Sequence, residues 1–241
     1  METIEQSIWD FRGLDRSDPN CLHSPEETVQ KIRELGFLPL FPNEVTGFSL
    51  AELTWGGGWW TDSPDVDPWL WREEIARSAE VAYGKFFRGR AGFVSLDWLP
   101  VFANYRRDGY DFDARFDDGK AKHRAKKIMD LFSEADELAS WEVRQLAGFG
   151  RGGEKNFTGI LTELEMQFYL VAKDFRRRIN ARGETYGWAV EILAPPERIW
   201  GYERVSAGYA EKPEASRDRI LRRVRELFPR ADEKSVQKLC R

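Results

Sequence analysis

Apolar residues recur every three or four positions in several parts of the chain, which is the spacing of one face of an α-helix. Residues 24–36 (SPEETVQKIRELG) have this spacing, with a serine placed to cap the first turn and a glycine after the last. The segments 67–87 and 95–109 have it as well, and they begin with Asp67 before a proline and with Ser95. We therefore predict helices over these three segments.

Two stretches between these segments lack a helical repeat. Residues 37–45 (FLPLFPNEV) contain two prolines, which remove backbone donors, so we expect an irregular but buried segment. Residues 54–71 (TWGGGWWTDSPDVDPWLW) combine three consecutive glycines with five tryptophans and predict a packed loop. Residues 91–94 favour a short strand.

The second half of the chain has three helical segments followed by two that are typical of strands. Helical spacing is found in residues 119–133, 140–149 and 157–167. Residues 168–178 (FYLVAKDFRRR) and 185–193 (TYGWAVEIL) are rich in aromatic and β-branched side chains and flank a turn at Gly183. Three helices followed by a β-hairpin is the order of a winged-helix module.

The predicted fold class is therefore α+β and predominantly helical. We expect a winged-helix module over residues 119–193, packed on a helical, aromatic-rich N-terminal region over residues 1–118. Residues 194–241 form a helical tail, in which residues 214–229 predict an amphipathic helix that packs back on the body. A last short helix is expected over residues 232–239.

Composition excludes several classes of protein. Hydrophobic residues make up 41% of the 241 positions, enough to bury a core, and no apolar run is long enough to cross a membrane. The first residues lack the pattern of a signal peptide, so we expect a cytoplasmic protein. The two cysteines and two histidines have no partner at a metal-ligand spacing, and GFGRGGEKNF (148–157) lacks the ending of a phosphate loop. We expect neither a metal nor a cofactor, and a flexible connection at 148–157.

Charge adds a candidate binding surface. Because the net charge is −4, contact with nucleic acid requires a segregated basic surface. Basic residues cluster in the first helix of the module and on the hairpin, where they could contact phosphates; ordinary solvated faces are the alternative interpretation. The candidate nucleic-acid-binding residues are Lys120, Lys122, Arg124, Lys126, Lys127, Arg176, Arg177, Arg178 and Arg182.

Aromatic and charged side chains also alternate densely in residues 67–87 and 104–113. Core packing with surface ion pairs would produce this pattern, and so would a cleft that stacks a base or binds a phosphate. The residues that would line the cleft are Trp59, Trp60, Tyr83, Lys85, Tyr105, Arg106 and Arg107. The nearest carboxylates, and so the candidate catalytic groups, are Glu73, Glu74 and Asp111.

Three segments resemble the AlkZ-like winged-helix proteins, a family that includes DNA glycosylases which unhook interstrand crosslinks and excise alkylated bases. They are IRELGFLPLFPNEV (32–45), WREEIARSAEVAYGKFFRGRAGFVSLDWLPVFANYRR (71–107) and TELEMQFYLVAKDFRRRINARGETYGWAVEIL (162–193). The resemblance covers residues 25 to 193 and implies a winged-helix fold with an activity on DNA.

The chain departs from the family at the catalytic motif. The family's enzymes have Gln-x-Gln or Gln-x-Asp after the first helix, which positions water at the sugar; the matching stretch here is LPLFP, with Pro39 and Phe41 at those places. YGKFF (83–87) stands where the family tends to have Trp-x-His. An apolar pair excludes water, so we predict no excision, or only weak excision, of simple alkylated bases.

These observations predict a DNA-associated winged-helix protein that is related to AlkZ-like DNA glycosylases and binds double-stranded DNA, without a membrane partner. If it is an enzyme that hydrolyses N-glycosyl bonds, Glu73, Glu74 or Asp111 has to replace the missing motif. The alternative is a non-enzymatic transcription regulator or protein-interaction module. A continuous positive groove joining the two basic clusters would favour DNA, and cations interspersed with carboxylates would favour the alternative.

Overall fold

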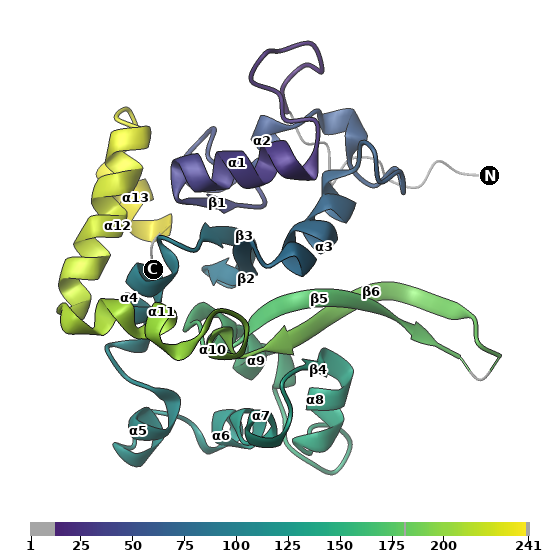
Figure 1. Cartoon of the computed structure of the whole chain (residues 1–241), viewed down its shortest axis with the longest axis vertical. Helices are drawn as coiled ribbons and strands as arrows, with labels where there is room; N and C mark the ends of the chain where they lie inside the picture. Colours follow the sequence, from purple (N-terminus) through teal and green to yellow (C-terminus); the bar gives the residue numbers. More distant parts are fainter. Residues whose placement is uncertain (1–12, 181, 240–241) are drawn as a thin grey trace.

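The computed structural model describes residues 13–180 and 182–239, and its fold is mixed α+β, as predicted. Two three-stranded antiparallel sheets are surrounded by helices (Figure 1). The strands are β1 (Phe37–Pro39), β2 (Val81–Phe87), β3 (Arg90–Ser95), β4 (Leu138–Ala139), β5 (Val171–Ile179) and β6 (Thr185–Ala194). The strand orders are β1-β3-β2 and β4-β6-β5.

The helices mostly follow the predicted order. They are α1 (Pro25–Leu35), α2 (Leu50–Leu53), α3 (Pro68–Ser78), α4 (Leu99–Arg107), α5 (Phe112–Asp117), α6 (His123–Met129), α7 (Leu131–Glu134), α8 (Ser140–Leu146), α9 (Phe157–Met166), α10 (Pro196–Trp200), α11 (Tyr202–Ser206), α12 (Pro213–Leu227) and α13 (Glu233–Leu239), with 3-10 turns at Gly56–Gly58 and Ala207–Ala210. The basic segment 119–133 therefore holds two short helices, α6 and α7, instead of one. Among the described residues, no helix combines the length and the apolar character needed to cross a bilayer.

The predicted helix over residues 67–87 is wrong in its second half. α3 ends at Ser78, Ala79 adopts a left-handed backbone with φ of 56°, and residues 81–87 form β2. Six of the seven residues in VAYGKFF are buried, and this aromatic and β-branched composition suits a strand covered by other elements. The next helix also begins later than predicted, because Ser95 ends β3 and α4 starts at Leu99.

The segment after α1 is buried, as predicted, but it is not irregular throughout. Phe37, Leu38 and Pro39 form β1, which pairs antiparallel with β3, and Phe37 and Leu38 are fully buried. Pro39 lies opposite Gly92 on the edge strand of its sheet. A proline is tolerated there because an edge strand does not need every backbone N–H for the ladder.

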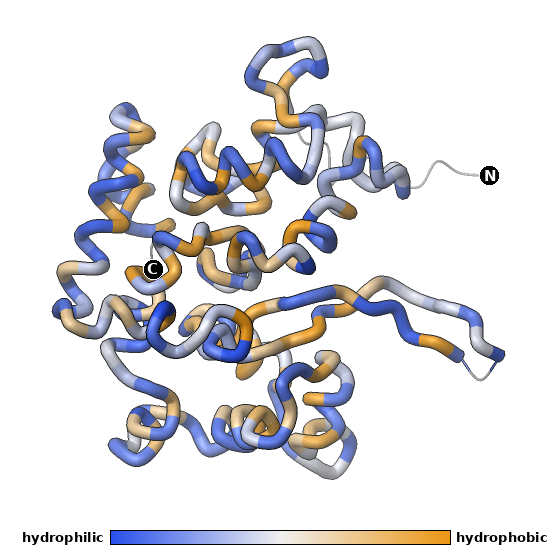
Figure 2. Tube along the Cα trace, viewed as in Figure 1, coloured by the Kyte–Doolittle hydropathy of each residue, from blue (hydrophilic) through white to orange (hydrophobic). Residues whose placement is uncertain are grey.

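The second sheet contains the predicted hairpin. β5 and β6 pair from Val171 opposite Ala194 to Ile179 opposite Thr185, and Gly183 in the turn has a φ of 80°. The hairpin is the longest projection of the molecule (Figure 1). Its root is buried, whereas its outer half is exposed and largely polar, with one apolar stretch near the end of β5 (Figure 2).

The buried side chains form two clusters that meet at the root of the hairpin. One cluster surrounds the first sheet and includes Ile220 and Val224 of α12, which packs on α4 as the tail prediction required. The other cluster joins α5–α9 and includes Ile128 and Leu164. The hairpin root therefore connects both parts of the core and fixes where its exposed half projects.

Candidate nucleic-acid interface

The cations of α6 and its flanks are paired within the chain. Lys122 Nζ lies 2.5 Å from a carboxylate oxygen of Glu163, and Lys127 Nζ lies 2.8 Å from Glu154. The remaining partners are Glu154 for Arg124, Asp130 and Asp113 for Lys126, and the Tyr110 hydroxyl for Lys120. This cluster is thus interspersed with carboxylates, the arrangement that the sequence analysis associated with the non-DNA alternative.

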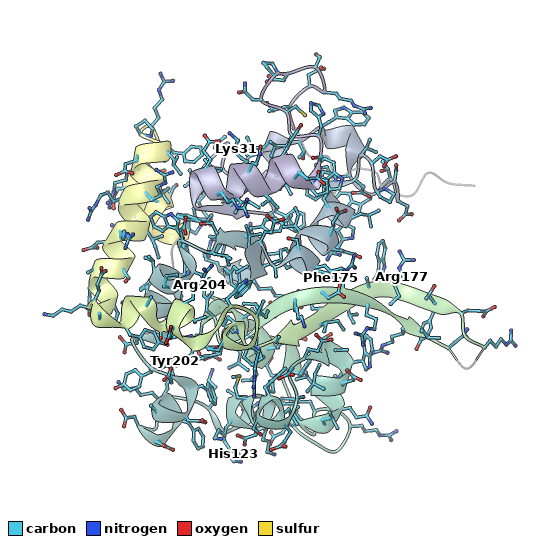
Figure 3. All side chains as sticks on the ribbon, viewed as in Figure 1. Lys31, His123, Phe175, Arg177, Tyr202 and Arg204 are labelled. Atoms are coloured by element: carbon cyan, nitrogen blue, oxygen red, sulfur yellow. The ribbon has the colours of Figure 1, made fainter. Side chains whose placement is uncertain are left out.

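The hairpin arginines have fewer internal partners. Arg176, Arg177 and Arg178 are exposed on the outer half of β5, and Arg182 is exposed beside the turn. Arg176 has a long contact of 3.7 Å with Glu137, whereas the described residues provide no ion pair for Arg177, Arg178 or Arg182. Figure 3 shows Arg177 further out along β5 than Phe175, on the side of the hairpin that faces α3. These arginines are available to an external anion.

A concave surface lies between α8 and the hairpin, and we call it the α8–hairpin groove. It consists of two adjoining hollows of ≈ 450 and ≈ 390 Å³ that share Trp141, Gln145 and Arg178. Its lining includes Trp141, Arg144, Gln145, Arg151, Arg176 and Arg178, and no carboxylate is among its described lining residues. The guanidinium carbon of Arg178 lies 5.2 Å from the centre of the Trp141 ring. This is a cation–π contact at the junction of the two hollows.

Trp141, Arg144 and Arg151 were not predicted as site residues from the sequence. The first two are three positions apart on α8, so helical spacing predicts that they lie on neighbouring parts of one face. Nothing in the spacing indicates that β5 lies beside this face. The arginine in GFGRGG was the one available signal, and it was assigned to a flexible connection. In the structure, residues 148–154 form a hydrogen-bonded turn instead.

The predicted pocket residues lie in several environments. Trp59 is buried and packs on the half-buried Trp60, with 5.6 Å between ring centroids. Tyr83 is buried elsewhere, between Phe93 and Phe175, and burial raises the pKa of its hydroxyl. The structure thus pairs the two tryptophans and places Tyr83 at the hairpin root.

The three pocket candidates of α4 have local partners. Arg107 is buried, donates to the carbonyl of Phe168 and pairs with Glu197, and these contacts tie α4 to the start of β5 and to α10. Arg106 lies 5.1 Å from the ring of Tyr105. Arg107 therefore has a clear structural role at the junction of the two cores.

Lys85 belongs to a buried ionic network between the two sheets. Its Nζ lies 2.7 Å from Glu165 of α9 and 2.8 Å from Glu191 of β6, and its backbone N–H donates to Glu165. Complete burial, followed by the charge of Glu191, raises the pKa of Glu165 to about 8. The two carboxylates outweigh the burial of Lys85 and raise its pKa. The network joins β2, α9 and β6.

The candidate catalytic carboxylates do not converge on one point. Glu73 of α3 is largely buried beside Arg72, and burial raises its pKa although the charges of Arg72 and Arg177 act in the opposite direction. Glu74 is exposed. Asp111 precedes α5, across the hairpin layer from α3 in Figure 1, and accepts a hydrogen bond of 2.8 Å from the Tyr202 hydroxyl. Of the three, only Glu73 combines burial with proximity to the hairpin.

A buried arginine beside Glu73 was also missed from the sequence. The guanidinium carbon of Arg72 lies 3.7 Å from the ring centre of Trp69 and 4.1 Å from that of Phe175. The cation is therefore held between α3 and the hairpin root, where the aromatic faces compensate for part of its lost hydration. Arg72 links the candidate carboxylate to the element that bears the exposed arginines.

The two positions at which the resemblance implies a polar motif are apolar in the structure as in the sequence. Pro39 is buried in β1, and the ring of Phe41 lies 5.9 Å from that of Trp59 and 6.3 Å from that of Trp69.

A family model described as AlkZ related matches residues 22–241. No curated protein and no solved structure matches the chain.

Proposed function

The chain belongs to the AlkZ-related family, and from this premise we propose that it is a DNA-associated protein that binds duplex through a winged-helix module and its hairpin. Its family relation connects it with DNA glycosylases. The observation that carries the proposal is the hairpin, which projects from the body and exposes Arg176, Arg177 and Arg178 on its outer half. Such side chains bind phosphates through charge-assisted hydrogen bonds and release counterions.

The order of elements supports the winged-helix assignment. Two short helices (α6 and α7), a short strand (β4), two helices (α8 and α9) and a hairpin (β5 and β6) follow one another along the chain. β4 pairs with β6, so the short strand completes a three-stranded sheet with the hairpin. In this assignment the hairpin is the wing, and α9 corresponds to the helix that usually enters the major groove.

A titration of labelled duplex tests the proposal. Affinity should be similar for unrelated sequences, because phosphate contacts carry no base information, and it should fall steeply from about 50 to about 200 mM salt. Fluorescence anisotropy on two duplexes of about 20 base pairs measures both properties. Absence of binding at the lowest salt concentration would reject the function.

We propose that base excision is weak or absent on simple alkylated bases such as N7-methylguanine. Pro39 and Phe41 cannot hold a water molecule, so any catalysis depends on another group. Glu73 is the best-placed carboxylate, because a raised pKa suits a general acid or base. If purified protein releases alkylated bases, Glu73→Gln should abolish turnover and leave duplex binding intact. Glu74→Gln and Asp111→Asn test the other two candidates in the same way.

One observation favours the alternative of a protein-interaction module. Trp188 and Ile179 on the hairpin are 70% and 64% exposed, and large apolar side chains at such exposure are typical of contact surfaces. A protein partner that docks on them would bind with little dependence on salt. The salt titration therefore distinguishes the two functions.

A further inference from the structure

The helix that a winged-helix module presents to the major groove is poorly suited to bind DNA here. α9 (FTGILTELEM) contains no lysine or arginine. Its Glu163 pairs with Lys122, and its Glu165 is fully buried against Lys85 of β2. The first sheet thus covers part of this helix, and the one charged side chain of α9 outside that contact, Glu163, is acidic. A DNA backbone requires another surface of the module.

The α8–hairpin groove is lined by arginines, whereas α9 has no cation. Arg144 and Arg151 are exposed on one wall, Arg176 and Arg178 are exposed on the other, and the described residues provide no ion pair for Arg144, Arg151 or Arg178. Among the described residues, the one ion pair of these four arginines is the contact of 3.7 Å between Arg176 and Glu137. The groove is therefore a locally basic surface on a chain whose net charge is negative.

Arg151 lines the groove from the turn over residues 148–154. The amide of Glu154 donates to the carbonyl of Gly148 at 2.9 Å, and the amide of Gly150 donates back to Glu154 at 3.2 Å. Gly148 and Gly152 have φ values of 75° and 80°, which only glycine adopts readily. The carboxylate of Glu154 pairs with Lys127 on α6 and so does not neutralise Arg151. The turn therefore exposes the cation of Arg151, while the carboxylate of Glu154 is engaged by Lys127.

We propose that the phosphate backbone of duplex DNA lies in the α8–hairpin groove, held by Arg144, Arg151 and Arg178, and that α9 is not the DNA-reading element. The inference rests on the proposed function and specifies its binding surface. Contact with the ring of Trp141 orients the guanidinium of Arg178 and leaves its N–H edges available for a forked contact with a phosphate. Gln145 supplies an amide donor between the two arginine walls.

The test uses full-length protein and a labelled duplex in a salt titration. Arg144→Gln combined with Arg151→Gln should weaken binding about tenfold or more at low salt and should reduce the slope of log K against log salt by about two. The matched control is Arg222→Gln combined with Arg230→Gln, which removes the same charge. Both residues are exposed, and Arg222 lies on α12 at the end of the molecule opposite the hairpin (Figure 1). The control should keep the wild-type slope.

The outcomes separate the inference from the function on which it rests. If the wild type binds duplex and the groove variant keeps its affinity and slope, the groove assignment is wrong while DNA binding stands. If the wild type does not bind, both fall. Equal losses in the groove and control variants would indicate a general charge effect and would also reject the groove. Unfolding curves of the wild type and of both double variants show whether each protein is folded. If the groove variant is unstable, the single substitution Arg151→Gln, on an exposed turn, replaces it in the titration.

Discussion

The α6 cluster and the hairpin cluster look alike in sequence and differ in structure. Each contains several cations within a short stretch of the chain. On α6 the cations bind carboxylates such as Glu154 and Glu163, whereas Arg177 and Arg178 of the hairpin have no ion pair among the described residues. A run of basic residues in the sequence therefore shows that positive charge is present. Whether that charge is available to a binding partner depends on the carboxylates that the fold places beside it.

Removing the hairpin cations should produce the largest change in duplex binding. Arg176→Ala, Arg177→Ala and Arg178→Ala together should weaken affinity about 100-fold at low salt, because three exposed phosphate-binding groups are lost. A fluorescence anisotropy titration of labelled duplex measures the effect.

The matched control removes three cations from the other cluster. Lys122, Lys126 and Lys127 already have carboxylate partners, so their replacement by alanine should change affinity by less than about threefold. Equal losses of affinity in the two triple variants would show that the hairpin cations are not more available to DNA than the α6 cations. A larger loss in the α6 variant would place the main DNA contact on α6.

An effect on stability, and not on DNA binding, is expected at Lys85, a third cation whose ion pairs are more buried than those of either cluster. The folded pKa of its partner Glu165 is raised from 4.5 to about 8, so the folded state favours the protonated carboxyl. This contribution to stability is complete below about pH 4.5 and is lost as pH rises toward 8. The free energy of unfolding should therefore fall over this interval.

Glu165→Gln removes the titration and should flatten that pH profile. Urea unfolding at several pH values between about 5 and 8 measures it. Glu163→Gln, two residues earlier on α9 and partly exposed, is the matched control and should keep the wild-type slope. Identical profiles for Glu165→Gln and the wild type would show that this carboxyl does not titrate with folding.

Local patterns predicted much of the fold. The Oγ of Ser24 accepts a hydrogen bond from the Glu27 amide at the start of α1, and Gly36 ends the helix with a φ of 95°, both as the cap signals require. The hairpin followed from two strand-like runs around Gly183. Such features are set by neighbours in sequence, so sequence alone can identify them.

The errors arose where distant contacts override local spacing. Residues 81–87 continue the apolar spacing of α3, yet α9 and β5 pack on them and bury them as a strand. The ion pairs of the α6 cations could not be predicted from the sequence for the same reason. Glu163 is 41 positions from Lys122, and Glu154 is 27 positions from Lys127. The α8–hairpin groove likewise combines segments that are separate in sequence. These features depend on topology, which periodicity does not encode.

Hydrogen–deuterium exchange with and without duplex DNA at low salt tests most directly whether DNA binds at the hairpin and not at α6. If DNA binds at the hairpin, residues 148–153 and 171–179 should exchange more slowly when duplex is added, because DNA covers the turn and β5. Residues 123–134 and 157–166 should exchange at unchanged rates, since their cations are paired or absent. Protection confined to α6 and α9, with the turn and β5 unchanged, would contradict the account.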